Sequence, residues 1–475
     1  MLLRGGSSSA VTAMDDDPIS AYDAAASGAK VIPLPTARQD GLPEFSDEAL
    51  ALKFTADHGN NLRYVSTLNK WLFWGGRRWE FDATELVLSR ARDLCRRESS
   101  RCASPAQAKS VGSAKTVRAV EFLARADRRH AATPDQWDRD PWLLNTPDGV
   151  IDLRTGAMRE HRQEDYLTRI TAVSPLAGAP MWIKSLETIT ANDIELRAYL
   201  RRVAGYCLTG STREHAMFFG FGTGANGKGT FLNTLTKIMG GYAVVAPMET
   251  FTASAGDRHP TELAMLRGAR FVTAQETEEG RRWAEAKIAA LTGGDPISAR
   301  EMRQDFFTFL PVFKLFIAGN HKPGLRNVNE AIRRRFNLIP FTVTIPKQQR
   351  DPSLPDKLVA EWPGILAWMI QGCLEWQSGG LNPPSAVLGA TIDYFEAEDT
   401  IKTWIDDRCI LNAGKFTETG KLFASYKAWS EKSREFVISL KRFSQDMENR
   451  DFRRGRSGST DRSGFYGIEI KQEDL

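Results

Sequence analysis

The sequence has few of the residues on which metal-bound and disulfide-bonded scaffolds depend. It contains 5 cysteines and 6 histidines in 475 residues, and no two cysteines form a C-x-x-C pair. Zinc ribbons use pairs of that spacing, and small disulfide-bonded domains use many more cysteines. We therefore expect neither a zinc ribbon nor a disulfide framework, which fits a reducing cytosol.

Long apolar runs and a strong charge of one sign are also absent. No uninterrupted apolar segment approaches the roughly 18 residues of a membrane helix, and the start of the chain lacks the hydrophobic region of a signal peptide. The 63 Lys and Arg against 59 Asp and Glu give a net charge of +4, which permits nucleic-acid binding without demonstrating it. We expect a soluble protein that is not exported and has no membrane partner.

The length predicts about three domains, and a hydrophobic content of 42% is enough for their cores. Residues 1–45 are rich in Gly, Ser, Ala, Asp and Pro, so we expect a disordered N-terminal tail. Residues 46–175 predict an α+β domain with helices over 47–54, 85–98 and 113–126, a meander over 62–81 and a hairpin at the Pro147–Gly149 turn. This domain has no arrangement of Ser, His, Asp or Cys that resembles a catalytic centre.

Aromatic residues in the predicted meander have two interpretations. Trp74 and Trp79 stand close to Arg77 and Arg78, and aromatic and basic side chains together can stack on bases and bind phosphates. Their alternating spacing is more typical of side chains in the core of a sheet. We favour the core, and base stacking remains the alternative.

A glycine-rich segment, residues 222–230, follows the apolar run 217–221 and precedes the helical pattern 231–239. A strand that leads through such a turn into a helix directs backbone N–H groups and the positive end of the helix dipole at one point, where phosphates can bind. The alternative is a glycine-rich turn with an incidental lysine. The residues predicted to hold the nucleotide are Gly222, Gly224, Ala225, Asn226, Gly227, Lys228, Gly229 and Thr230.

Lys228 and Thr230 are the residues of this loop with side-chain roles. The Lys228 ammonium group reaches the β- and γ-phosphates in the G-x-x-x-x-G-K-[ST] pattern, and the hydroxyl after it ligates Mg²⁺. Here Gly229 stands after the lysine, and the hydroxyl comes one residue later, at Thr230. Magnesium ligation is therefore assigned to Thr230.

Three further features follow the loop in sequence. The apolar run 269–275 ends at Glu276, where a carboxylate can hold Mg²⁺ or polarise water. A second run, 311–319, ends at Asn320, whose amide can contact the γ-phosphate and the attacking water. Arg334 and Arg335 belong to a triplet that precedes another apolar run. Each feature alone can also be explained as an exposed charged or polar side chain. The order of the features must therefore decide between a functional site and exposed side chains.

Taken together, residues 222–231, 275–287, 291–300, 313–323 and 331–336 carry five motifs in the order and spacing of a known family. The chain resembles the superfamily-3 helicases of the AAA+ class, specifically the phage and plasmid primase-helicases related to the poxvirus replicative NTPase. The resemblance extends over residues 46–175 and does not include the first 45.

The resemblance implies ATP and Mg²⁺ as cofactors. It makes Lys228 the phosphate-binding lysine, Glu276 the acid that holds the metal with Thr230, and Asn320 the sensor. Arg334 or Arg335 becomes a finger that acts on the nucleotide of a neighbouring subunit.

The family also carries a DNA-gripping hairpin between the acid and the sensor. Residues 297–309 fit this hairpin, with Arg300 and Arg303 near its tip.

The C-terminal part, residues 385–475, predicts three helices, over 394–407, 417–433 and 439–449, followed by two strands around a basic turn. This pattern is typical of a winged helix-turn-helix, in which Arg453, Arg454 and Arg456 would bind phosphates. A winged helix that docks only on protein is the alternative. The predicted fold is thus α/β: a P-loop AAA+ ATPase core over 176–378, an α+β N-terminal domain and a C-terminal winged-helix-like domain.

The function implied is an ATP-dependent DNA helicase of phage, prophage or plasmid replication in the bacterial cytoplasm. It would be a homo-oligomer, with a hexameric ring expected, that moves on single-stranded and forked DNA. Residues 1–45 are too few for a primase domain, so priming would need a separate chain. Two alternatives stay open: a nucleotide-switched origin-binding or primase-accessory ATPase that does not unwind DNA, and a P-loop kinase or transferase, which would need an acceptor pocket.

Overall fold

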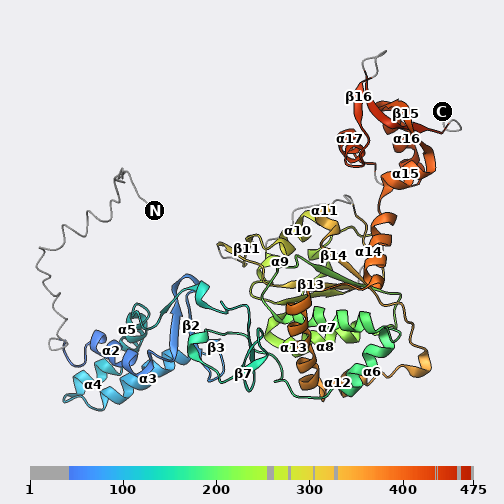
Figure 1. Cartoon of the computed structure of the whole chain (residues 1–475). Coiled ribbons are helices and arrows are strands. Elements are labelled where there is room, and N and C mark those ends of the chain that lie inside the picture. The colour runs from blue at the N-terminus through green and yellow to red at the C-terminus, as the bar shows by residue number, and fades with distance from the viewer. Residues whose placement is uncertain are drawn as a thin grey trace, which may run out of the picture. The chain divides into compact units, whose positions relative to one another are not determined.

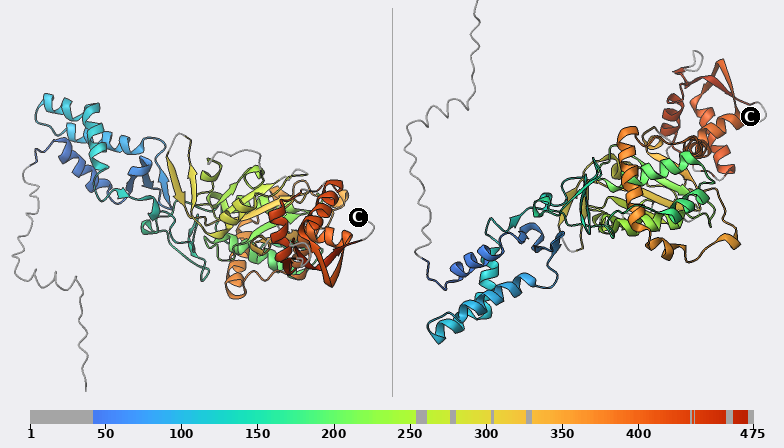
Figure 2. Two further views of the ribbon diagram at one scale, coloured as in Figure 1. Left: turned by 90° about the horizontal axis from the view of Figure 1, so that it is seen from above. Right: turned by 60° about the horizontal axis from the view of Figure 1, so that its bottom comes forward.

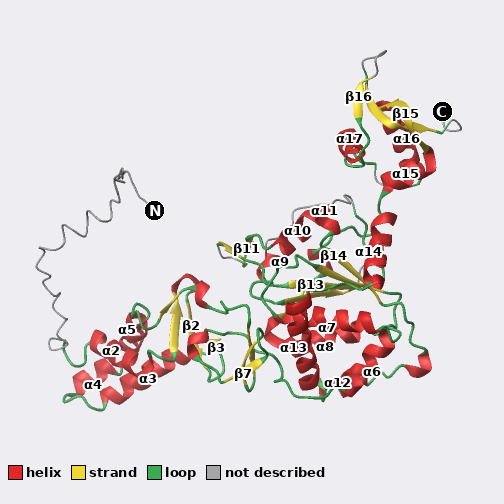
Figure 3. Cartoon of the chain, in the orientation of Figure 1, coloured by secondary structure: helices red, strands yellow, loops and turns green. Residues whose placement is uncertain are grey.

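The computed structural model describes residues 42–253, 261–275, 280–302, 305–325, 330–433, 435, 437–456 and 462–471. Of the predicted N-terminal tail, residues 1–41 lie outside this part. The chain divides into two compact units, shown in Figure 1 and, by secondary structure, in Figure 3. The first contains residues 42–60 and 84–130, and the second contains 61–83 and everything from 131 onward.

The first unit is a helical bundle, which both views of Figure 2 show in blue and cyan. Three of its helices begin at serine N-caps, Ser46, Ser104 and Ser113, each of which accepts a hydrogen bond from a backbone N–H of the first turn. Glu98 is buried and pairs with Lys53 at 2.9 Å. The helices are α2 (Asp47–His58), α3 (Leu86–Ser99), α4 (Pro105–Val111) and α5 (Ala114–Ala124).

A small sheet begins the second unit. Strands β1 (Leu62–Val65), β2 (Lys70–Trp74) and β3 (Trp79–Phe81) form the predicted antiparallel meander, and β4 (Ala131–Ala132) adds in parallel beside β1. Trp79 is 1% exposed, with the Arg63 guanidinium 5.0 Å from its ring centre. Trp79 therefore belongs to the core of this sheet and does not face solvent.

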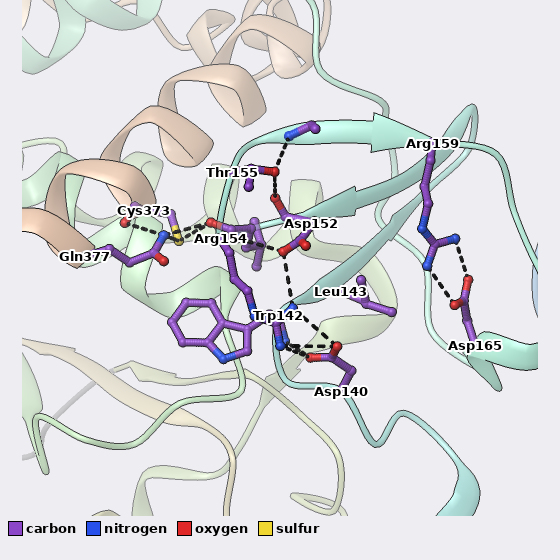
Figure 4. A network of polar contacts seen from close by, with 12 residues as sticks. Asp140, Trp142, Leu143, Asp152, Arg154, Thr155, Arg159, Asp165, Cys373 and Gln377 are labelled. Carbon is purple, nitrogen blue, oxygen red and sulfur yellow. Dashed lines mark hydrogen bonds and ion pairs between the residues drawn. The ribbon is translucent and has the colours of Figure 1, made fainter.

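A three-stranded hairpin sheet follows, formed by β5 (Leu143–Thr146), β6 (Gly149–Asp152) and β7 (Ala157–Arg159), and Thr146 pairs with Gly149 across the predicted turn. Figure 4 shows how its loop is held. Arg154 pairs with Asp140 at 3.1 Å and with Asp152 at 3.3 Å. The carbonyl of Leu153 accepts a hydrogen bond at 2.7 Å from the Gln377 amide of α13 (Trp362–Gly379). The hairpin is thereby attached to the large domain that follows.

That domain is built on a five-stranded parallel sheet in the order β14-β8-β13-β10-β9. Successive side chains of a strand alternate between the two hydrophobic cores: Phe218 lies in one, and its neighbours Met217 and Phe219 lie in the other. A sheet buried on both faces explains the near-continuous apolar runs. The strands are β8 (Met217–Phe221), β9 (Ala243–Val245), β10 (Phe271–Gln275), β13 (Lys314–Gly319) and β14 (Phe336–Pro340).

Helices cover both faces of this sheet (Figure 1). One face packs against α6 (Pro180–Ile189), α7 (Ile194–Leu208), α8 (Lys228–Met239), α12 (Leu354–Val359) and α13. The other packs against α9 (Thr261–Ala264), α10 (Glu285–Gly293), α11 (Glu330–Arg333) and α14 (Ser385–Ala397). The chain is therefore a mixed α/β protein with a parallel sheet and an N-terminal α+β region.

Helix α14 differs from the prediction that the C-terminal domain begins at residue 385. Its Tyr394 and Phe395 rings pack against Phe336 of β14, so this helix is part of the sheet's second core. The predicted helix over 394–407 is in fact two helices, because Asp399 caps a new one by accepting a hydrogen bond from the Lys402 N–H at 3.0 Å.

A separate hydrophobic core begins at Ile401. A sheet in the order β15-β17-β16 completes it, and strand β15 is one that the sequence pattern did not predict. No helix within the described residues is long and apolar enough to span a membrane. The elements of this region are α15 (Thr400–Arg408), β15 (Cys409–Glu418), α16 (Thr419–Lys432), α17 (Leu440–Glu448), β16 (Arg454–Arg456) and β17 (Ser463–Ile470).

Helices α7 and α13 meet at two glycines. A Cβ atom added at Gly205 would lie 2.0 Å from the Cys373 backbone nitrogen, and one added at Gly372 would lie 2.0 Å from the Arg201 carbonyl oxygen. Both distances are far below van der Waals contact, and in each case the opposing atom belongs to the backbone. The close approach of the two helices therefore requires glycine at both positions.

Two buried cations donate hydrogen bonds to carbonyl oxygens at the carboxyl end of α7. Lys314 donates to the Thr209 carbonyl oxygen, and Arg270 donates to the Leu208 carbonyl oxygen at 2.9 Å. Positive charge is favourable at this end of a helix dipole. Complete burial nevertheless disfavours the ammonium form and lowers the pKa of Lys314 to about 7.

We predict that Gly205→Ala lowers the free energy of unfolding by about 2 kcal/mol or more, because the helix backbones must separate. Gly389→Ala in α14 is the matched control, since nothing lies within 4 Å of the added Cβ. The control should gain about 0.5–1 kcal/mol from helix propensity. Thermal melting of both variants checks this, and equal melting temperatures would contradict the packing described.

Lys314 should give stability a distinctive pH dependence. Below pH 7 both folded and unfolded states carry the proton, so the cost of burying the charge is fully present. Between pH 7 and the unfolded pKa near 10.5 the unfolded state binds more protons, so the free energy of unfolding rises with pH by about 1.4 kcal/mol per unit. Urea unfolding of the wild type minus that of Lys314→Met, compared at pH 6, 7, 8 and 9, should be flat to pH 7 and then rise. Parallel curves throughout would refute the assignment.

Candidate nucleotide-binding site

The glycine-rich loop joins β8 to α8 in a backbone conformation that residues with a Cβ atom rarely adopt. Gly224 and Gly227 have φ angles of +103° and +79°, in the region that favours glycine. A Cβ added at Gly227 would lie 2.3 Å from Ile189, and one added at Gly222 would lie 2.2 Å from the Phe341 carbonyl oxygen. The loop therefore depends on glycine at these positions for shape as well as for access to a ligand.

The segment that leaves β14 holds the loop from behind. The Asn226 side chain is 2% exposed, and its amide donates to the Phe341 carbonyl oxygen at 3.0 Å. The Ile345 N–H donates to the Ala225 carbonyl oxygen at 2.9 Å. From the sequence Asn226 was assigned to the loop only as a nucleotide-binding position. The structure shows that its side chain also connects the loop to β14, a contact between residues far apart in sequence.

Lys228, the first residue of α8, lies under the loop and is 9% exposed. Its ammonium group donates to the Gly222 carbonyl oxygen and to the Asn320 side-chain oxygen, each at 2.6 Å. Burial lowers the pKa of Lys228. The structure thus brings the predicted lysine and the predicted sensor into direct contact, although 92 residues separate them in sequence.

These residues surround a cavity of about 320 Å³ at the carboxyl ends of β8, β10 and β13. Ligands of parallel α/β sheets bind in this location. Thr230 lines the cavity, and a Cβ added at Gly229 would meet nothing within 4 Å, so packing does not explain the glycine at that position. The lining residues are Gly224, Ala225, Asn226, Gly227, Lys228, Gly229, Thr230, Gln275, Ala318, Gly319 and Asn320.

The predicted acid, Glu276, lies outside the described residues. Gln275, the residue before it, ends β10 and lines the cavity, and its amide donates to the Asn233 side-chain oxygen of α8 at 2.7 Å. Among the described residues there is no cluster of three His, Cys, Asp or Glu side chains that could hold a metal ion.

The three arginines before β14 have different surroundings. Arg335 is 8% exposed, and its guanidinium donates to the Ala331 carbonyl oxygen. Burial and the neighbouring Arg334 charge lower the pKa of Arg335. Arg333 lies over the Phe395 ring at 5.2 Å. Arg334 is exposed. The sequence treated Arg334 and Arg335 as equivalent candidates, and the structure separates them.

The predicted DNA-gripping hairpin, which lies in sequence between Gln275 and Asn320, is formed by β11 (Ile297–Arg300) and β12 (Phe306–Phe309). Arg300 pairs directly with Phe306, and its guanidinium lies 5.0 Å from the centre of the Phe306 ring. Phe306 is 61% exposed. The other predicted tip residue, Arg303, lies outside the described residues. The sequence pattern alone does not single out Phe306, although an aromatic and a basic residue at either end of a short hairpin could have indicated it.

The predicted basic edge near the C-terminus is exposed at Arg453, Arg454 and Arg456. Arg454 pairs with Glu448 of α17 at 2.9 Å, and Arg453 lies over the Tyr466 ring at 4.5 Å. Part of this charge is therefore already balanced within the domain.

Comparisons with known proteins agree with the motifs. Residues 51–191 match the family described as "D5 N terminal like", and residues 221–335 match the "Family of unknown function (DUF5906)". The chain is 23% identical over 324 residues to "Putative helicase L207/L206" of Acanthamoeba polyphaga mimivirus, with 62% of this chain and 33% of that protein covered. It is 22% identical over 384 residues to "Putative helicase 022R" of Frog virus 3, with 62% and 39% covered.

The chain spans only about a third of the length of these curated relatives. A solved structure of the NrS-1 C terminal region covers 86% of this chain and 96% of its own chain, at 9% identity and a TM-score of 0.46, which is too weak a likeness to assign the fold. The two family matches and the viral relatives carry the assignment. By these matches the chain is similar to the phage and viral primase-helicase family.

Proposed function

We propose that this protein is an ATP-dependent DNA helicase, a motor that hydrolyses ATP and moves on single-stranded DNA. The observation that carries the proposal is the contact of Lys228 with Asn320 beneath a phosphate-binding loop. A simple nucleotide-binding turn needs the lysine alone. A lysine joined to a polar residue at the end of an adjacent strand places a phosphate-binding group and a water-orienting group at one point.

Binding of a nucleotide would change the partners of both groups. The Lys228 ammonium group now bonds two oxygens of the protein, Gly222 O and Asn320 Oδ1, and phosphate oxygens would replace them as acceptors. The Asn320 amide oxygen would then be available to orient a water molecule. Thr230 and Glu276 would hold Mg²⁺, which neutralises charge on the phosphates when bound.

Assembly into a ring, with a hexamer as the expected form, would complete the site. Arg334 is the exposed member of the triplet, so it can reach a neighbour's nucleotide, whereas the buried Arg335 positions the turn before β14. A finger supplied in trans makes hydrolysis depend on assembly.

DNA would contact the hairpin and the C-terminal domain. Arg300 can bind phosphates and the exposed Phe306 ring can stack on a base. The order α15, β15, α16, α17, β16, β17 supports a winged helix, with Arg453, Arg454 and Arg456 at its basic edge.

We predict that the wild-type protein hydrolyses ATP and that single-stranded DNA stimulates hydrolysis. Lys228→Ala should abolish turnover, because Lys228 is the only cation among the described residues that line the cavity. Lys237→Ala is the control, since it removes an exposed lysine from the same helix. Steady-state phosphate release with and without oligo(dT) measures all three. Hydrolysis without DNA stimulation would favour a nucleotide-switched protein over a motor, and near-normal turnover in Lys228→Ala would remove the proposal.

The trans role of Arg334 should appear in mixing experiments. Wild type mixed with Arg334→Ala at fixed total protein should show ATPase activity below the line of simple dilution, because each variant subunit silences a neighbour's site. A trans arginine is typically worth about 10³ to 10⁵ in rate. Arg333→Ala is the matched control from the same triplet. A linear response with assembly intact would place Arg334 outside the site.

A further inference from the structure

Helix α5 of the first unit carries a basic face with one aromatic residue in it. Lys115, Arg118, Phe122 and Arg125 follow one another at steps of three, four and three residues, which places them on one side of the helix. The opposite side packs into the bundle, and its buried residues are Thr116, Val117, Val120, Glu121 and Ala124. We call the outward set, Lys115, Arg118, Phe122 and Arg125, the α5 stripe.

The aromatic member of the stripe is held open to solvent. Phe122 is 66% exposed. Arg125 is fixed beside it by two hydrogen bonds to the nearly buried Glu121, at 2.8 and 2.9 Å, and its guanidinium lies 6.0 Å from the centre of the Phe122 ring. The ring is not among the buried residues of α5, so it does not contribute to the bundle core and is open to a ligand.

The unit carries 12 lysines and arginines against 9 aspartates and glutamates, and the basic excess lies in its second segment. Residues 84–130 contain 11 lysines and arginines against 5 aspartates and glutamates. Two of the α3 cations have partners: Arg96 pairs with Asp93 at 3.0 Å, and Arg97 pairs with Asp57 at 2.7 Å. Within the described residues, Lys115 and Arg118 have no ion pair. Their charge is available for an anion from outside the chain.

From this combination we propose that the α5 stripe binds single-stranded nucleic acid. Cations spaced along a helix contact successive phosphates, and an exposed ring between them offers a stacking surface for an unpaired base. A duplex would hide that base face. The stripe has a single large apolar side chain, so it lacks the contiguous apolar area that a protein partner needs.

The dimensions of the stripe agree with a short strand. Lys115 and Phe122 are seven residues apart, or about 10 Å along the helix axis. A surface of that length can contact only a short stretch of one strand. The stripe belongs to a different unit from the nucleotide site and does not depend on the proposed ATPase activity.

The test uses the full chain without ATP and fluorescence anisotropy with labelled dT15 and U15. Lys115→Gln/Arg118→Gln should weaken binding at least fivefold and reduce the slope of log affinity against log salt by about 1.4, since each phosphate contact on a single strand contributes about 0.7. Phe122→Ala should weaken binding about five- to a hundredfold, the range of one stacked base. Phe122→Trp should retain binding and show fluorescence quenching on addition of the oligonucleotide. Comparing dT15 with U15 shows whether the surface distinguishes DNA from RNA.

Arg96→Gln/Arg97→Gln on α3 is the matched control, because it removes the same charge from the same unit at side chains that are already paired. Its affinity should stay within twofold of the wild type. If the two double variants lose equal oligonucleotide affinity, the effect is explained by net charge alone, and the proposal is overturned. Unchanged oligonucleotide affinity together with an altered sedimentation coefficient in the Lys115→Gln/Arg118→Gln and Phe122→Ala variants would assign the face to a second copy of the chain and also overturn it. Melting temperatures of all variants, and basal ATP hydrolysis without DNA, should match the wild type.

Discussion

The structure depends most on the attachment of the glycine-rich loop, residues 222–230, to the segment that leaves β14. A loop with glycines at φ angles of +103° and +79° has little preference for one shape of its own. The Asn226 amide and the Ala225 carbonyl fix that shape through Phe341 and Ile345. Because Asn226 is buried, loss of its Phe341 partner would leave a buried polar group unpaired. The shape of the cavity therefore depends on contacts between the loop and the segment that follows β14.

The same strand connects the cavity to the arginines. β14 begins directly after Arg335 and ends at Pro340, next to Phe341. Its neighbours hold it along its full length: β8 pairs with every residue of it, and Tyr394 and Phe395 pack on Phe336. A shift of the turn that carries the arginines would therefore be passed to the glycine-rich loop through a packed strand rather than through a flexible linker.

Much of the large domain could be predicted from sequence because its signals are local. The apolar runs ending at Phe221, Gln275 and Gly319 are strands buried on both faces, and such runs need no knowledge of their partners to be recognised. The strand order, the contact of Lys228 with Asn320, and the difference between Arg334 and Arg335 could not be predicted, because each depends on residues far apart in the chain or on burial. Strand β15 was missed for another reason. Most of its residues are exposed, so it lacks an alternating apolar pattern. The tail, Glu276 and Arg303 stay predictions.

The route of the chain between the two units has a practical consequence for anyone who trims this protein. The path crosses from one unit to the other after residues 60, 83 and 130, since residues 61–83 form β1, β2 and β3 of the second unit. No single truncation can remove the helical bundle without also deleting that meander, and a protease cut at one crossing would leave the bundle attached through the other two. An excision of the bundle would have to remove 42–60 as well as 84–130 and rejoin residue 83 to residue 131. In that sense α3, α4 and α5 form an insertion between strands β3 and β4 of the small sheet.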